Sequence, residues 1–155
     1  MTGVGTAAAP GGRIVVGVDG SSASALALGY AVSEARLRRA TLDVVLAWQI
    51  PAMWDSVPVP TSLDLEATGV RCLQNALSAV PADDIVVRQQ VIQGHPATVL
   101  LDAATTADLL VVGSRGHGGF VGSLIGSVSH RCVAHATCPV VVVPAHCYDR
   151  HMVGA

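Results

Sequence analysis

Short apolar runs alternate along the chain with longer segments of mixed character. The short runs are rich in valine, isoleucine and leucine, which is typical of strands buried on both faces, and they occupy residues 13–18, 41–47, 85–92, 109–112 and 140–143. The longer segments predict helices over residues 22–39, 63–80, 96–105 and 127–136. This alternation predicts an α/β fold: a five-stranded, mainly parallel sheet sandwiched by four helices and connected by right-handed crossovers.

Polar and special residues indicate how some of these elements begin and where they lie. The sequence DGSS at residues 19–22 follows the first strand and is typical of a polar loop that ends in a helix N-cap. Pro96 suits the first turn of the third helix. Arg88, Gln89 and Gln90 make the third strand less apolar than the others, so we expect it near an edge of the sheet.

The length of 155 residues fits one domain with its own core. We assign that domain to residues 13–144, between a flexible N-terminal tail (1–12) and a C-terminal tail (145–155) that has no assigned role. Residues 48–61 contain three prolines and predict a long loop at the exit of the second strand.

Composition excludes several classes of protein. All nine basic residues are arginines, so no Walker lysine, Schiff base or pyridoxal enzyme is expected. The net charge of −2 comes without a basic stripe, which argues against nucleic acid as a partner. Every apolar run is shorter than the roughly 18 residues of a membrane span, and residues 1–12 do not resemble a signal peptide, so we expect a cytoplasmic protein without membrane contact.

The cysteines and histidines do not form a recognisable metal motif. Neither CxxC nor HExxH occurs, and His130 and His135 are spaced so that they share a helix face poorly. We therefore expect no structural metal site and interpret the four cysteines as small hydrophobic residues.

The sequence GSRGHGGFVGSLIGS, residues 113–127, holds six glycines directly after the fourth strand. Glycines there have a structural interpretation, since they permit tight turns. They also have a functional one, because a glycine loop that enters a helix N-terminus lets backbone N–H groups approach an anion closely. A lone Gly-x-x-Gly would more often be a turn.

The spacing within this stretch is more specific than its composition. Gly113, Gly116, Gly126 and Ser127 form the pattern G-x2-G-x9-G-(S/T), which resembles the ATP-binding signature of the universal stress protein family. The sequences IVVGVDGS at the front of the chain and CPVVVVP near its end strengthen the resemblance. It implies a Rossmann-like fold similar to that of the adenine nucleotide alpha hydrolases, with strand order 3-2-1-4-5.

The resemblance also implies roles for individual residues. Asp19 would lie near the phosphates of ATP, and the backbone of Ala47 would contact adenine. Because a carboxylate opposes phosphate, we expect a divalent cation, Mg²⁺, between them. The ribose and phosphates would lie along Val112, Gly113, Arg115, Gly116, Gly126, Ser127 and the amide of Val128.

Each of these residues has an alternative interpretation. Asp19 would serve equally as a helix N-cap, and Arg115 as a solvated surface charge. His117, in the same glycine loop, is expected to face solvent and not to act as a base. Physical reasoning agrees with the phosphate role of Gly126 and Ser127, because they open a helix whose N-terminus carries a partial positive charge.

The expected function is an ATP-binding regulatory module of the stress response with little or no turnover, and no catalytic residue is assigned. The alternatives are a slow ATPase or adenylyl or phosphoryl transferase of the same fold, and a module that acts through protein contacts alone. An NAD-dependent oxidoreductase is set aside because GxGxxG does not follow the first strand. The resemblance suggests a homodimer through residues 140–143, although the prolines on either side would also protect that edge.

Overall fold

The computed structural model describes residues 11–50, 62–115 and 125–146. Strands and helices alternate as the sequence predicts, with boundaries that differ by only a few residues. In chain order the elements are β1 (Arg13–Gly17), α1 (Ser22–Arg38), β2 (Thr41–Trp48), α2 (Ser62–Ser78), β3 (Val87–Gln93), α3 (Pro96–Ala103), β4 (Leu109–Gly113), α4 (Ser127–His135) and β5 (Val140–Val143).

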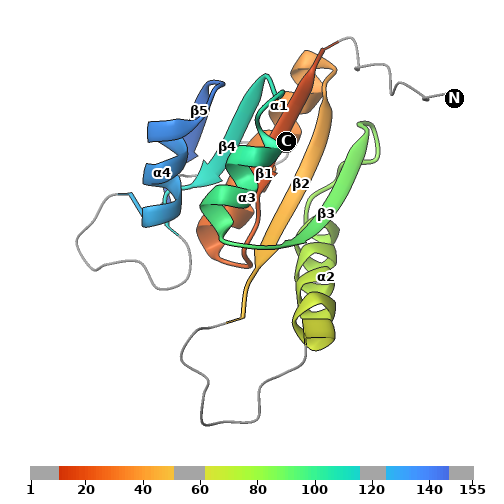
Figure 1. Ribbon diagram of the computed structural model, residues 1–155. Helices are drawn as coiled ribbons and strands as arrows, with labels where there is room; N and C mark the ends of the chain where they lie inside the picture. Colours follow the sequence, from red (N-terminus) through yellow and green to blue (C-terminus); the bar gives the residue numbers. More distant parts are fainter. Residues whose placement is uncertain (1–10, 51–61, 116–124, 147–155) are drawn as a thin grey trace, which may run out of the picture.

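The five strands form one sheet in the order β3-β2-β1-β4-β5, and each pair of neighbours is parallel (Figure 1). This confirms the predicted fold class and strand order, including the expectation that the polar third strand lies at an edge. Strands β1 and β4 are adjacent, with Val16 opposite Val111. The loops that follow these two strands therefore leave the same edge of the sheet side by side.

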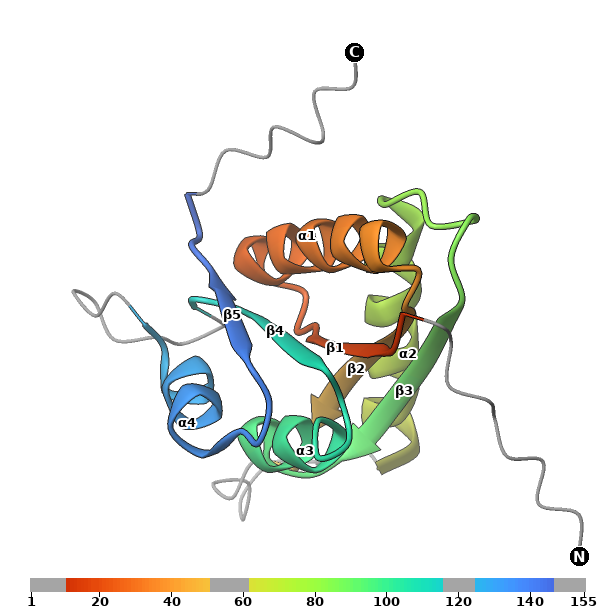
Figure 2. The same ribbon diagram turned by 90° about the horizontal axis from the view of Figure 1, so that it is seen from above.

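Two helices cover each face of the sheet (Figure 2). On one face α1 and α2 pack over even-numbered residues of β1 and β2, with Leu28 of α1 and Leu73 of α2 fully buried. On the other face Leu100 of α3 and Cys132 of α4 belong to a second buried cluster that includes Val15 of β1. The central strands β1, β2 and β4 are thus buried on both sides, which is why their sequences are mainly apolar, whereas the edge strand β3 carries Arg88, Gln89 and Gln90.

A polar cluster lies at the amino ends of the strands, opposite the edge from which the loops after β1 and β4 leave. Asp43 of β2 is 2% exposed, and its Oδ2 accepts a hydrogen bond from Nη1 of Arg13 at 2.6 Å. Nη2 of the same arginine donates to the carbonyl of Ala103 and to the hydroxyl of Thr106. One guanidinium therefore joins β1, β2 and the end of α3.

Several predicted features lie outside the described residues. They include most of both tails, most of the 48–61 loop, and the part of the glycine loop that holds Gly116 and His117. Among the helices of the described part, none is long and apolar enough to cross a membrane.

Candidate functional site

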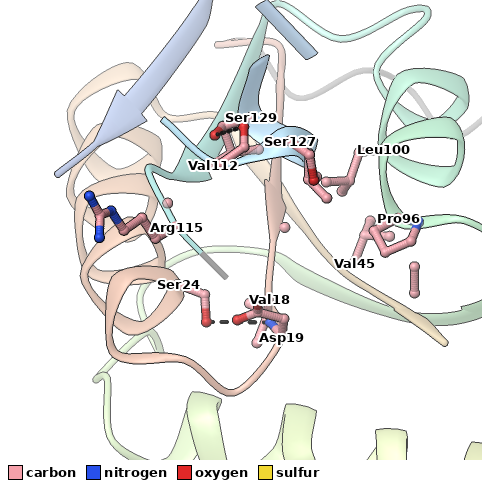
Figure 3. A pocket seen from close by; sticks show the side chains of 15 residues that line it. Val18, Asp19, Ser24, Val45, Pro96, Leu100, Val112, Arg115, Ser127 and Ser129 are labelled. Atoms are coloured by element: carbon pink, nitrogen blue, oxygen red, sulfur yellow. Dashed lines mark hydrogen bonds between the residues drawn. The ribbon is translucent and has the colours of Figure 1, made fainter. Parts of the chain in front are cut away.

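A pocket of about 260 Å³ lies at the carboxyl ends of β1, β2 and β4, where the order of the strands reverses. Ligands of open α/β sheets bind at this place. Its lining comes from all three strands and from the N-terminal ends of α1, α3 and α4 (Figure 3). The lining residues are Gly17, Val18, Asp19, Ser24, Val45, Ala47, Pro96, Leu100, Val112, Gly113, Arg115, Gly126, Ser127, Val128 and Ser129.

The structure brings eight of the nine sequence-predicted site residues to this one pocket. Only Gly116 falls outside the described residues. The eight come from four separated parts of the chain: Asp19, Ala47, the end of β4 with Arg115, and the start of α4. What each of them binds remains a prediction.

Sequence reasoning missed other members of the lining. Val45 shares the β2 face of Ala47, so the period of two along a strand would have indicated it. Pro96 and Leu100 come from α3. Their sequence predicts only a helix that begins with a proline after an edge strand, and this pattern does not indicate a pocket. Ser24 and Ser129 are buried hydroxyls with no motif of their own.

The loop between β1 and α1 is held by a compact set of hydrogen bonds. Ser21 is the N-cap of α1, since its hydroxyl accepts from the amide of Ser24 at 3.2 Å. Asp19 is therefore not the N-cap. Its Oδ1 accepts from both the amide and the hydroxyl of Ser21, while its own amide donates to Oγ of Ser24 at 3.3 Å (Figure 3). This fixes an exposed carboxylate at the mouth of the pocket.

The backbone of Ala47 points into the pocket. Residues of β2 alternate between their two neighbouring strands: Leu42 and Trp48 bond toward β3, whereas the carbonyl of Val45 accepts from Val18 beside β1. By this alternation Ala47 faces the β1 side. Because β1 ends at Gly17, the N–H and C=O of Ala47 have no strand opposite them.

An apolar wall lines the same pocket as these backbone groups. It consists of Val45 from β2 and of Pro96 and Leu100 from α3. Gly17 allows the close approach of α3, because a Cβ atom there would lie 2.8 Å from Cδ1 of Leu100. A flat ring with polar atoms at its edge would find both apolar side chains and the polar backbone of Ala47 in this pocket.

The N-terminus of α4 forms the other end of the pocket. In α1 and α3 the side chains of Ser21 and His95 accept hydrogen bonds from the first turn, but the N-cap of α4 is Gly126, which has no side chain to do so. The amides at the start of α4 lie beside the pocket with the partial positive charge of the helix terminus. This end of the pocket suits an anion.

Two buried serines hold α4 in this place. The hydroxyl of Ser129, which is 2% exposed, lies 3.2 Å from the carbonyl oxygen of Ser114 and 3.1 Å from that of Gly126, and its single hydrogen is shared between these two acceptors. The carbonyl of Ser114 also accepts from the amide of Gly126. The start of α4 is thereby fastened to the residue that follows β4.

Arg115 and Asp19 bring charge to the pocket. The hydroxyl of Ser21 lies 3.5 Å from the carbonyl oxygen of Arg115, so the loop after β1 and the loop after β4 are in contact. The Arg115 guanidinium lies on the α1 side, apart from Ser127 (Figure 3).

Asp19 also affects the pKa of Cys72 in α2. Burial raises the pKa of the Cys72 thiol, and the negative charge of Asp19 raises it further. No group of three or more potential metal ligands occurs within residues 11–50, 62–115 and 125–146.

The model of the universal stress protein family matches residues 12–144. A universal stress protein of Mycolicibacterium smegmatis is 40% identical over 133 residues, which are 84% of this chain but only 45% of that protein. The chain therefore spans less than half the length of this curated relative.

Solved structures show the same fold. The universal stress protein UspA from Lactobacillus plantarum superposes with a TM-score of 0.67 at 25% identity, covering 87% of this chain and 99% of that one. A universal stress protein crystallised in complex with cAMP has a TM-score of 0.62 at 27% identity, with coverage of 90% and 99%.

Proposed function

Because the chain belongs to the universal stress protein family, we propose that the pocket binds an adenine nucleotide, with ATP as the ligand that its two ends fit best. The observation that carries the proposal is the uncapped N-terminus of α4, which shares one pocket with an apolar wall and the unpaired backbone of Ala47. A related structure contains cAMP, which supports a nucleotide as the class of ligand.

Adenine fits the end of the pocket near β2. Its ring would lie between Val45 and Leu100, which contribute carbon atoms only. Its edge carries an acceptor nitrogen beside an amino group, and these complement the N–H and C=O of Ala47. The backbone pair would thus select for a base with this donor and acceptor order.

The phosphates fit the end formed by α4. The amides of Ser127, Val128 and Ser129 carry no side-chain cap, and the helix terminus adds roughly half a positive charge. The hydroxyl of Ser127 can donate as well, and Arg115 lies within the same lining. A polyphosphate would therefore gain more here than an uncharged nucleoside.

Asp19 is the predicted contact for a cation. One oxygen, Oδ1, is already engaged by Ser21, which leaves Oδ2 to face a Mg²⁺ ion carried by the phosphates. A single protein carboxylate is typical of Mg²⁺ sites, in which water and phosphate supply the remaining ligands. The ion would offset the repulsion between Asp19 and the nucleotide.

We infer a regulatory role for the bound nucleotide, with little or no turnover, in the cytoplasm. The described lining offers only Asp19 as a carboxylate and no histidine or lysine to activate a water molecule. Slow hydrolysis and group transfer are the alternatives, and chromatography of ATP incubated with the protein distinguishes them from simple binding.

A homodimer through β5 is a second proposal. Among the strands that the structure describes, β5 pairs only with β4, and Val140 and Val142 direct their backbone groups toward the other edge. An open apolar edge favours pairing with another strand. Sedimentation of the wild type and of Val142→Pro, which removes an outward-facing N–H, tests this pairing; the variant should shift toward monomer.

The nucleotide site is tested by denaturing freshly purified protein, identifying any released nucleotide, and titrating the stripped protein with ATP and Mg²⁺. The variant Gly126→Glu should weaken ATP binding by about 100-fold or more, because a carboxylate beside phosphate costs several kcal/mol. Its fold should persist, since acidic residues stabilise a helix N-terminus.

The matched control is His130→Glu, which adds the same charge to α4 at an exposed position outside the pocket lining. It should bind ATP much more tightly than Gly126→Glu. A folded Gly126→Glu protein with unchanged affinity would contradict the assignment of the site, and a wild type that neither retains nor binds nucleotide would contradict the function.

A further inference from the structure

Ser114, the residue after β4, makes hydrogen bonds to two separate parts of the chain at once. It is 5% exposed. Its amide donates to the carbonyl of Val143 at 2.8 Å, and its hydroxyl accepts from the amide of Ala145 at 3.1 Å. Its carbonyl accepts from the amide of Gly126 and from the hydroxyl of Ser129. Ser114 therefore joins the start of α4 to the end of β5.

One of these bonds, from the Ala145 amide to the Ser114 hydroxyl, departs from the regular ladder between β4 and β5. At its start the amide of Leu110 donates to the carbonyl of Pro139, and the bond from Ser114 to Val143 repeats this pattern. The next step of a regular parallel ladder would join the Ala145 amide to the Ser114 carbonyl. The Ser114 hydroxyl accepts that amide instead.

This change of acceptor, from the carbonyl to the hydroxyl of Ser114, matters because the carbonyl already accepts hydrogen bonds from the start of α4. A carbonyl oxygen has two lone pairs: the Gly126 amide donates to one, and the hydroxyl of Ser129, whose single hydrogen is shared with the carbonyl of Gly126, donates to the other. Without the hydroxyl, the amide of Ala145 would have to compete with α4 for the same oxygen. The side chain of Ser114 removes this competition.

We propose that Ser114 is a positioning residue for the nucleotide site, and that it couples occupancy of the pocket to the end of β5. The inference rests on the proposed function. The Ser114 hydroxyl accepts the hydrogen bond from the Ala145 amide, so the Ser114 carbonyl can accept the hydrogen bonds that position the start of α4. The N-terminal amides of α4 would then contact the phosphates. Neither the hydroxyl of Ser114 nor the backbone of Ala145 belongs to the pocket lining.

The sharpest test is a pair of substitutions. Ser114→Ala removes the hydroxyl, and the Ala145 amide then competes for the carbonyl, so the affinity for ATP with Mg²⁺ should fall about fivefold or more. Ala145→Pro removes the competing N–H. In the double variant the affinity should therefore return to within about twofold of the wild type, which is the usual error of additivity.

The control is Ser78→Ala, which removes an exposed hydroxyl that bonds to Asn75 in the last turn of α2. It should bind ATP like the wild type. If Ser114→Ala only loosened local packing, Ala145→Pro would not restore affinity, and that result would overturn the inference. Unchanged affinity in Ser114→Ala would overturn it as well and leave the proposed function standing.

Hydrogen exchange of the wild-type chain gives a second measurement that needs no variant. ATP with Mg²⁺ should slow exchange at the start of α4, residues 126–130, and also at residues 140–146, because Ser114 ties the two together. Protection confined to residues 126–130 would overturn the coupling alone. Absence of ATP binding in titration and of protection anywhere would overturn the proposed function, and the coupling with it.

Discussion

The backbone of Gly113 lies directly against Ala23 in the first turn of α1: a Cβ atom at Gly113 would be 2.8 Å from the carbonyl carbon of Ala23 and 2.9 Å from its oxygen. No side chain fits this space, whether or not a ligand is bound. Gly126 differs, since a Cβ atom there would meet its nearest neighbour, the Ser114 carbonyl oxygen, at 3.3 Å. The two glycines of one motif therefore serve different purposes.

Gly113→Ala should destabilise the fold by about 1–3 kcal/mol, because the added methyl group must displace backbone and not a flexible side chain. Urea denaturation measures this loss. The comparison variant is Gly69→Ala in α2, where the nearest atoms are side-chain carbons of Leu46 and Val91 at 3.0 Å.

Gly69→Ala should cost clearly less, since helix propensity offsets part of the crowding by about 0.5–1 kcal/mol. Equal losses in the two variants would show that contact with Ala23 is not what requires glycine at position 113.

Arg13→Met should destabilise the protein by about 3–5 kcal/mol, because it leaves the carboxylate of Asp43 buried without its partner. The Oδ1 atom of Asp43 already has no hydrogen-bond partner, so the ion pair with Arg13 carries the whole compensation. Thermal and urea denaturation at neutral pH measure the effect.

The double variant Arg13→Met with Asp43→Leu should recover most of that stability, as apolar replacements of buried ion pairs often do. A double variant no more stable than Arg13→Met would indicate that the contacts of Arg13 with Ala103 and Thr106 matter more than the charge of Asp43.

Cys132 should react far more slowly with iodoacetamide in the folded protein than Cys72 or Cys138. Burial raises the pKa of the Cys132 thiol to about 11, against a small opposite effect of Arg131, and the residue is fully buried. Cys72 and Cys138 are half-buried. Peptide mapping by mass spectrometry after timed alkylation at pH 8.5 measures the three rates.

The same shift makes stability depend on pH. The ordinary pKa of the thiol is 9.0, so the unfolded chain loses this proton first, and the contribution of Cys132 is complete below that pH and lost as pH rises toward about 11. Cys132→Ala should lose less stability than the wild type between these values; an equal loss would show that other groups dominate.

Asp19→Asn should reduce the dependence of ATP binding on Mg²⁺. The neutral amide no longer repels phosphate and binds the cation poorly, so chelation by EDTA should change the affinity of the variant less than that of the wild type. Calorimetric titrations with and without EDTA measure the difference. An undiminished effect of EDTA in the variant would place the cation elsewhere.

The positions of strands and helices could be predicted from the sequence, because both depend on local patterns. Valine-rich runs such as residues 140–143 indicate buried strands, and the serines after β1 indicate a helix start, from a few neighbouring residues alone. The glycine motif lies after β4, and eight of the residues predicted with it line one pocket at that edge of the sheet.

Contacts between distant segments could not be predicted in this way. The pairing of Arg13 with Asp43, the wall made by Leu100, and the hydrogen bonds of Ser114 and Ser129 each join elements that are far apart in the chain. None of these residues belongs to a local pattern that differs from an ordinary strand, helix or turn.

The sequence by itself determined the alternation of elements, their burial and the place of the glycine motif, since each follows from side chains close together in the chain. Only the tertiary structure decided that Gly113 is required by Ala23, and that the Ser114 hydroxyl replaces its carbonyl in the β-ladder. The physical reason is that close packing and lone-pair occupancy depend on which backbones meet, and the fold alone brings β4, β5, α1 and α4 together.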